Sequence, residues 1–174
     1  MKEMLRYGFI LGLICLIASG LLAGMNSLTK ARILAQAQAE EQASLKEVMP
    51  QAANFEAVKA DGNIIYYKAQ DTKGNFLGVA FKTTAKGYSS IIETMVGMNK
   101  DGTINTIKIL NQNETPGLGA RVVEPSFTGQ FAHKPAVDLS DVQVITGATI
   151  SSQAVIDAVK EKANEIQELI KNAK

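Results

Sequence analysis

The chain has 174 residues, of which 46% are hydrophobic and 20% charged, and its formal net charge is +1 at neutral pH. This length allows one compact domain and an additional segment, and the balanced charge argues against nucleic acid or strongly acidic molecules as partners. A single cysteine excludes an internal disulfide framework, and a single histidine argues against a Cys/His metal centre or a histidine-dependent catalytic site.

The first segment of the chain is an uncharged apolar run at residues 7–29. About 23 residues in a helix cross the ~30 Å core of a bilayer, so we predict a retained single-pass anchor in the cell (inner) membrane. The run is too long for a cleaved signal peptide, and bulky residues before Cys15 disfavour a lipoprotein anchor. Basic residues in the tail, residues 1–6, favour a cytoplasmic N-terminus, although Lys30 and Arg32 on the opposite flank weaken that preference.

The next segment, residues 30–50, is rich in Ala, Gln, Glu and Leu and has loosely helical apolar spacing. We expect the anchor helix to continue here as a stalk that ends at Pro50. The remaining residues, 51–174, are expected to form an extracytoplasmic domain.

Alternating apolar and polar residues begin at Phe55 and continue through five short segments. Turn signals such as Asp61-Gly62 and Asp101-Gly102 connect them, and this arrangement predicts an antiparallel meander with one face on the core. Gly87-Tyr88 interrupts the pattern, which indicates a bend, a close approach to a ligand or an ordinary surface loop. The expected strands are residues 55–60, 64–69, 76–83, 92–99 and 103–110.

A glycine-containing loop follows the fifth strand. Pro116 and Gly117 occupy the second and third positions of a predicted turn, and Gly119 allows a second unusual backbone angle. Such a loop can wrap around a flat ligand, with Glu114 accepting hydrogen bonds from its ring or sugar chain, although an ordinary reverse turn has the same composition. The candidate residues here are Glu114, Thr115, Gly117, Leu118 and Gly119.

A second unusual loop precedes the last helix, which is predicted from apolar residues at helical spacing between Val155 and Ile170. Free amides and the helix dipole make its N-terminus a candidate phosphate site, and small side chains leave room for the ligand. Alternatively, Thr149 or Ser151 caps the helix. The motif reads Thr146-Gly147-Ala148-Thr149-Ile150-Ser151-Ser152.

Together, these two loops resemble those of the G subunit of the Rnf electron-transport complex, which is related to the C subunit of the sodium-pumping NADH:quinone reductase. The likeness extends over nearly the whole chain and includes Met95-Val96-Gly97 in the fourth strand. It implies an α+β fold with an N-terminal transmembrane helix, a helical stalk, and a small FMN-binding domain of antiparallel strands with a C-terminal helix.

The resemblance also implies a function and a site. FMN would be joined by a phosphoester to Thr149 by a separate flavin transferase, with Thr146, Gly147, Ala148 and Ser151 around it. The chain would relay electrons within an ion-translocating ferredoxin:NAD oxidoreductase complex, in contact with other membrane and peripheral subunits. Since the flavin supplies the chemistry, no complete catalytic site and no metal site are expected.

Two residues depart from the pattern of that family. Gln143 replaces an Asp that commonly lies six residues before the modified threonine, and Gln112 replaces a His before the first loop. The alternative to the flavoprotein hypothesis is a single-pass extracytoplasmic binding or assembly module without flavin, in which both loops are ordinary turns and caps. His133, beside Pro135, is expected to be an exposed loop residue.

Overall fold

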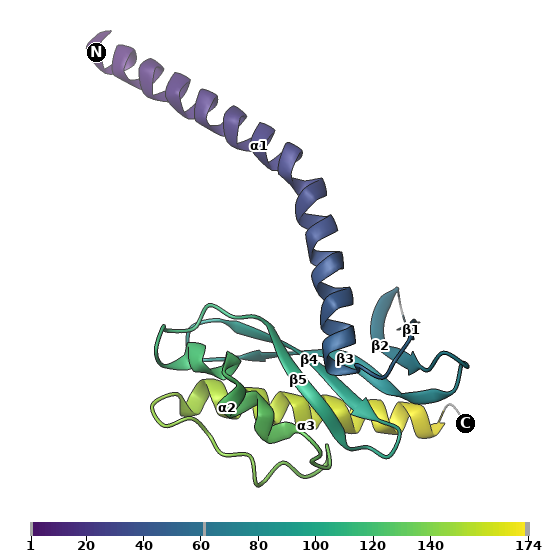
Figure 1. Ribbon diagram of the computed structural model, residues 1–174. Helices are drawn as coiled ribbons and strands as arrows, with labels where there is room; N and C mark the ends of the chain where they lie inside the picture. The colour runs from purple at the N-terminus through teal and green to yellow at the C-terminus, as the bar shows by residue number, and fades with distance from the viewer. Residues whose placement is uncertain (1, 61, 173–174) are drawn as a thin grey trace. The chain divides into compact units, whose positions relative to one another are not determined.

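The computed structural model describes residues 2–60 and 62–172, and these divide into two compact units between Gln42 and Ala43. Asp61 of the predicted turn lies outside the described residues, as do both chain ends. The N-terminal unit consists of helix α1 (Lys2–Val48) as far as Gln42 (Figure 1). The C-terminal unit contains the last turn of α1 and all other elements.

Helix α1 is, among the described residues, the one helix that is long and apolar enough to cross a membrane. The large apolar side chains between Met4 and Leu28 are exposed, as expected for a segment that is stabilised by lipid rather than by a protein core. The helix continues without interruption to Val48, two residues before the end predicted at Pro50.

Five strands form one antiparallel sheet in the order β1-β2-β3-β4-β5, which confirms the predicted meander. Short turns connect the strands, and Gly102 in the predicted Asp101-Gly102 turn has a φ of 85°. The bounds differ from the predicted ones by three residues at most: β1 (Asn54–Ala60), β2 (Asn63–Gln70), β3 (Phe76–Lys86), β4 (Ile91–Asn99) and β5 (Ile104–Asn111).

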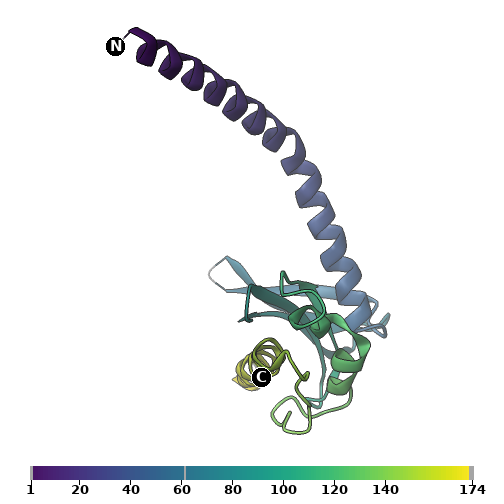
Figure 2. The same cartoon turned by 90° about the vertical axis from the view of Figure 1, so that its left-hand side faces the viewer.

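One face of the sheet packs against the long C-terminal helix α3 (Thr149–Asn172), which Figure 2 shows along its axis. Side chains alternate between the two faces of β4, so Ile92 and Val96 point into this cluster while Met95 lies in a second one. The helix contributes apolar side chains at the predicted spacing: Val155, Ile156, Val159, Ala163 and Ile166.

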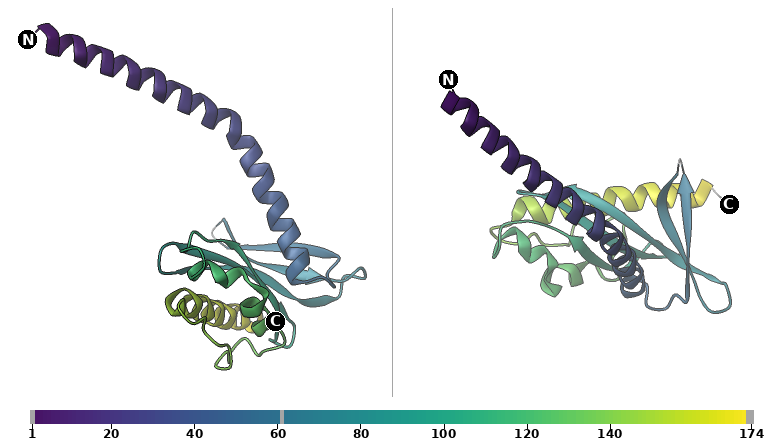
Figure 3. Two further views of the ribbon diagram at one scale, coloured as in Figure 1. Left: turned by 60° about the vertical axis from the view of Figure 1, so that its left-hand side comes forward. Right: turned by 90° about the horizontal axis from the view of Figure 1, so that it is seen from above.

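The opposite face of the sheet is covered by the last turn of α1 (Figure 3, left). In this turn Leu45 and Val48 are fully buried. The two backbones approach closely, since a Cβ on Gly97 would lie 2.2 Å from the carbonyl oxygen of Val48. Asn105 donates a hydrogen bond to the same oxygen at 2.7 Å, and Lys108 forms an ion pair with Glu47. The end of α1 is therefore part of the core of the C-terminal unit.

Between β5 and α3 the chain forms three short helical segments that the sequence pattern did not predict: η1 (Gly119–Val123), α2 (Pro125–Thr128) and η2 (Gly129–Phe131). The rings of Phe127 and Phe131 are buried and pack edge to face, with centroids 5.4 Å apart. This packing holds the connection beside α3 and brings the chain back to the second loop. His133 is exposed, as predicted.

Candidate functional site

A pocket of about 400 Å³ lies between the loop after β5 and the start of α3. Both segments lie at one end of the sheet (Figure 1). The two candidate loops thus come together although they are about 30 residues apart in the chain. All predicted site residues except Thr146 and Gly117 line the pocket. The lining residues are Tyr88, Glu114, Thr115, Leu118, Gly119, Gly147, Ala148, Thr149, Ile150 and Ser151.

The pocket combines apolar and polar walls. Tyr88, Leu118 and Ile150 are large side chains that line it while remaining exposed. Carboxylate and hydroxyl groups also line the pocket, including those of Glu114 and Ser151. Such a pocket suits a ligand with a flat apolar part and a polar chain.

Glu114 is the most buried polar residue of the first loop, with 6% of its surface exposed. Its Oε1 accepts hydrogen bonds from the amides of Ser89 (3.0 Å) and Ser90 (2.8 Å) and from the hydroxyl of Ser90 (3.1 Å). Its Oε2 accepts one from the hydroxyl of Ser151 at 2.7 Å. This carboxylate therefore ties together the bend before β4, the loop after β5 and the first turn of α3.

These contacts also determine the ionisation of Glu114. Burial by itself would raise the pKa of the carboxyl group, but the hydrogen bonds from Ser151, Ser90 and Ser89 outweigh it and hold the pKa below its usual value. The ionised form is therefore the one that the pocket wall favours.

Two glycines make room for this carboxylate. A Cβ on Gly87 would lie 2.6 Å from Oε1 of Glu114, and a Cβ on Gly119 would lie 2.6 Å from Oε2. The expectation of an unusual backbone angle at Gly119 is wrong, because its φ is not positive. Glycine is needed there because the neighbouring carboxylate leaves no room for a side chain. Gly117 does have a positive φ, 76°, in the predicted turn that the amide of Leu118 closes onto Thr115.

The second loop reaches α3 through a tight turn. The amide of Ala148 donates to the carbonyl of Ile145 at 2.9 Å, and Gly147 between them has a φ of 84°. The hydroxyl of Ser152 braces this turn, since it donates to the carbonyl of Ala148 (2.8 Å) and accepts from the amide of Ile145 (3.1 Å). A Cβ on Gly147 would lie 3.4 Å from Cδ2 of Leu118, so the two loops lie close together.

The alternative of a side-chain cap by Thr149 or Ser151 is wrong. Thr149 is the first residue of α3, and the hydroxyl of Ser151 donates to Glu114 instead. Within the described residues, the amides of Thr149, Ile150 and Ser151 have no hydrogen-bond acceptor. The start of α3 therefore presents free donors to the pocket.

The four hydroxyl groups of the motif have different surroundings. Those of Ser151 and Ser152 are buried and hydrogen bonded. Thr146 is exposed but does not line the pocket. Thr149 is exposed, lines the pocket, and its hydroxyl has no hydrogen-bond partner among the described residues. It is thus the accessible hydroxyl at this end of the pocket.

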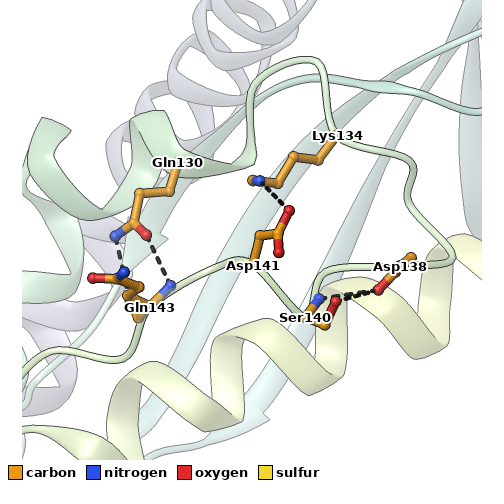
Figure 4. A network of polar contacts seen from close by, with 6 residues as sticks. All are labelled: Gln130, Lys134, Asp138, Ser140, Asp141 and Gln143. Atoms are coloured by element: carbon orange, nitrogen blue, oxygen red, sulfur yellow. Dashed lines mark hydrogen bonds and ion pairs between the residues drawn. The ribbon is translucent and has the colours of Figure 1, made fainter.

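The segment before the motif is held by a polar network (Figure 4). The side chain of Gln130 accepts a hydrogen bond from the amide of Gln143 at 2.8 Å and donates one to its carbonyl at 3.4 Å. Lys134 pairs with Asp141 at 3.4 Å. These contacts fix the path of the backbone that enters the second loop.

Comparison with known proteins agrees with this geometry. Residues 1–48 match the model of the RnfG N-terminal region, and residues 87–164 match that of the FMN-binding domain. The G subunit of an ion-translocating oxidoreductase complex from Methanosarcina acetivorans is 38% identical over 173 residues, covering 91% of this chain and 92% of the relative. The chain belongs to the RnfG family. This confirms the resemblance that the two loops indicated.

A second relative of this RnfG-family chain is the G subunit of the Na⁺-translocating ferredoxin:NAD⁺ oxidoreductase complex of Acetobacterium woodii, 32% identical over 98% of this chain and 95% of the relative. Among solved structures, the crystal structure of Shewanella oneidensis NqrC matches with a TM-score of 0.51 and 20% identity, over 70% of this chain and 74% of that one. The shared fold confirms the predicted α+β architecture.

The structure shows the contacts of Gln143 and Gln112, the two residues that depart from the family pattern. At Gln143 the backbone is bound by Gln130, while the side chain is exposed. At Gln112 the side-chain oxygen accepts a hydrogen bond from the amide of Glu114 at 2.7 Å, so this residue supports the loop. Neither side chain lines the pocket.

Several residues of the site were not predicted as such from the sequence. Tyr88 stood out only as a break in the strand pattern, and Ile150 only as part of the motif, yet both line the pocket. Ser89 and Ser90, which bind Glu114, carried no signal because they lie about 24 residues away from it in the chain. The one signal in the sequence for this part of the site was Tyr88, an aromatic residue beside Gly87.

Proposed function

We propose that this chain is a membrane-anchored flavoprotein subunit that carries FMN on Thr149 through a phosphoester and relays electrons within an Rnf-type complex. Its membership of the RnfG family and its FMN-binding domain support the flavoprotein role. The observation that carries the site assignment is the Thr149 hydroxyl, which is exposed, lines the pocket and has no partner among the described residues.

The residues of the pocket fit FMN in a consistent way. A phosphate on Thr149 would meet the amides of Ile150 and Ser151 and the positive end of the α3 dipole. Gly147 and Ala148 leave room for the sugar chain, and Leu118 belongs to the apolar wall that suits the ring. When bound, the flavin supplies electron uptake and release, while the protein positions and shields it.

The names of the relatives suggest the wider reaction. The Acetobacterium woodii relative belongs to a ferredoxin:NAD⁺ oxidoreductase that translocates Na⁺. We propose that the present chain passes electrons between other subunits of such a complex and needs no substrate site of its own. Maturation requires a flavin transferase that moves FMN from FAD to the Thr149 hydroxyl, forming the phosphoester as the pyrophosphate bond breaks and AMP leaves.

The Thr149→Ala variant is expected to lose all covalent flavin, because the substitution removes the acceptor hydroxyl and little else. The wild type and the variant would be expressed with the transferase and run on a denaturing gel under ultraviolet light. A fluorescent wild-type band and a dark Thr149→Ala band are expected.

Thr146→Ala is the matched control, since the same change three residues earlier affects a side chain outside the pocket. Mass spectrometry of the tryptic peptide from Val122 to Lys160 would locate the modification. Flavin attached to another residue would contradict the assignment to Thr149. A dark wild-type band would contradict covalent attachment altogether and favour a module without covalent flavin.

A separate proposal concerns orientation. We infer that residues 1–6 are cytoplasmic, residues 7–29 cross the membrane and the flavin domain lies outside the cytoplasm, because basic residues favour the cytoplasmic side. We expect activity from a reporter that is fused after Lys174 and that functions only outside the cytoplasm. A cytoplasmic reporter fused at the same position serves as the control, and its activity would reverse the assigned orientation.

A further inference from the structure

Glu114 is a buried charge without a counter-charge. Within the described residues no lysine, arginine or histidine forms an ion pair with it, and all four of its hydrogen-bond donors are neutral groups. Hydrogen bonds of this kind stabilise a carboxylate but do not cancel its charge. The wall of the pocket therefore carries one net negative charge.

The geometry favours the ionised state of this group. The amides of Ser89 and Ser90 can only donate, so Oε1 must accept from both. Ser151, which donates to Oε2, lies in the first turn of α3, where the helix dipole favours a negative charge. The lowered pKa of the carboxyl group agrees with this arrangement.

We propose that Glu114 tunes the bound flavin: its fixed negative charge in the pocket wall lowers the reduction potential of FMN. This inference rests on the proposed function, since it needs FMN in the pocket that Glu114 lines. Full reduction of the ring takes two electrons from an external reductant. Whenever the ring takes up fewer protons than electrons, it gains negative charge, which Glu114 repels.

The size of the effect follows from Coulomb's law. Two unit charges several ångström apart near a protein surface interact by at least about 1.4 kcal/mol, which corresponds to tenfold in an equilibrium constant. For a two-electron couple, tenfold corresponds to about 30 mV. Removing the charge is therefore expected to make reduction about tenfold more favourable.

Glu114→Gln is the appropriate variant because it removes the charge and keeps the shape. The amide oxygen can accept from Ser89 and Ser90, and the amide nitrogen can donate to the Ser151 hydroxyl, which rotates to accept. Glu168→Gln is the matched control: it makes the same chemical change on an exposed side chain, in the last turns of α3, far along the helix from the pocket.

The experiment is a spectroelectrochemical titration of the flavin-loaded full chain at neutral pH. In Glu114→Gln the equilibrium constant for reduction is expected to rise about tenfold, which makes the potential about 30 mV more positive. Glu168→Gln is expected to match the wild type. A third variant, Ser151→Ala, retains the charge while breaking the hydrogen bond to Oε2, so its potential should not rise.

Several outcomes would overturn the inference. One is a fully loaded Glu114→Gln protein whose potential is unchanged or lower, and another is an equal rise in Ser151→Ala, which would indicate positioning rather than charge. Carbon-13 NMR of the wild type is a test that does not depend on the flavin content of any variant. A protonated Glu114 at neutral pH would overturn the inference. A wild type without flavin would instead contradict the proposed function itself.

Discussion

A chain that begins at Gln51 is expected to fold far less stably than one that begins at Lys30. The sequence pattern placed the start of the domain at residue 51, but the structure buries Leu45, Val48 and Met49 in the second core of the C-terminal unit. Burying each of these side chains contributes about 1.5–3 kcal/mol, so their removal costs about 5–9 kcal/mol in total. A domain of ordinary stability has about 5–15 kcal/mol.

The shorter chain loses polar contacts as well. Asn105 would lose the carbonyl of Val48 that it binds, and Lys108 would lose its ion pair with Glu47. Met95 and the backbone around Gly97 would become exposed to water. Urea unfolding of the two soluble chains measures the difference, since both lack the apolar run at residues 7–29.

Leu45→Ala in the chain that begins at Lys30 is the control for this prediction. It keeps the helix and is expected to lower the free energy of unfolding by about 2–5 kcal/mol, as core truncations do. Equal unfolding midpoints for the two chain lengths would show that the end of α1 contributes nothing to the domain.

Gly119→Ala is expected to lower the free energy of unfolding by about 2.5–6 kcal/mol and to reduce flavin attachment. The new Cβ would lie 2.6 Å from Oε2 of Glu114 and 2.8 Å from Oγ of Ser151. Overpacking costs about 1–3 kcal/mol, and the displaced hydrogen bond to a charged group about 1.5–3 kcal/mol. The substitution would thus separate the loop from α3 and distort the pocket wall.

Gly117→Ala is the matched control two residues earlier in the same loop. A Cβ on Gly117 would meet nothing within 4 Å, but its φ of 76° is strained for alanine. We expect a cost of about 1–2 kcal/mol, with normal flavin attachment, because this residue does not line the pocket. Thermal unfolding and in-gel fluorescence measure both effects, and a larger loss in Gly117→Ala than in Gly119→Ala would contradict the steric explanation.

Most of the fold could be predicted because its elements carry strong local signals. Alternating residues and Asp-Gly turns defined the five strands, and apolar spacing after the second loop defined α3. The segments η1, α2 and η2 were not predicted, since helices of three to five residues are too short to show periodicity. The burial of Leu45 and Val48 was missed because it depends on Gly97, which lies about 50 residues away in the chain.

For the site, the sequence identified the two loops but not the contacts that join them. Glu114 was expected to bind the ligand; the sequence did not reveal that its oxygens also accept hydrogen bonds from Ser89, Ser90 and Ser151. A glycine in a sequence can have either of two causes. The backbone needs a positive φ, as at Gly117, or the neighbouring atoms leave no room for a Cβ, as at Gly119. Only tertiary structure distinguishes these two reasons.

The close packing around Glu114 has a consequence for the evolution of these proteins. Gly87 and Gly119 are glycine because the carboxylate of Glu114 lies where a Cβ would be crowded. The hydroxyl of Ser151 donates a hydrogen bond to the same carboxylate. A lineage that replaced Glu114 by a small residue would relax the constraint on both glycines, with Ile92 and Ser151 still 2.8 Å from their added Cβ atoms, and would leave Ser151 without its acceptor. We therefore expect these positions to co-vary among relatives, as residues do when they share one contact.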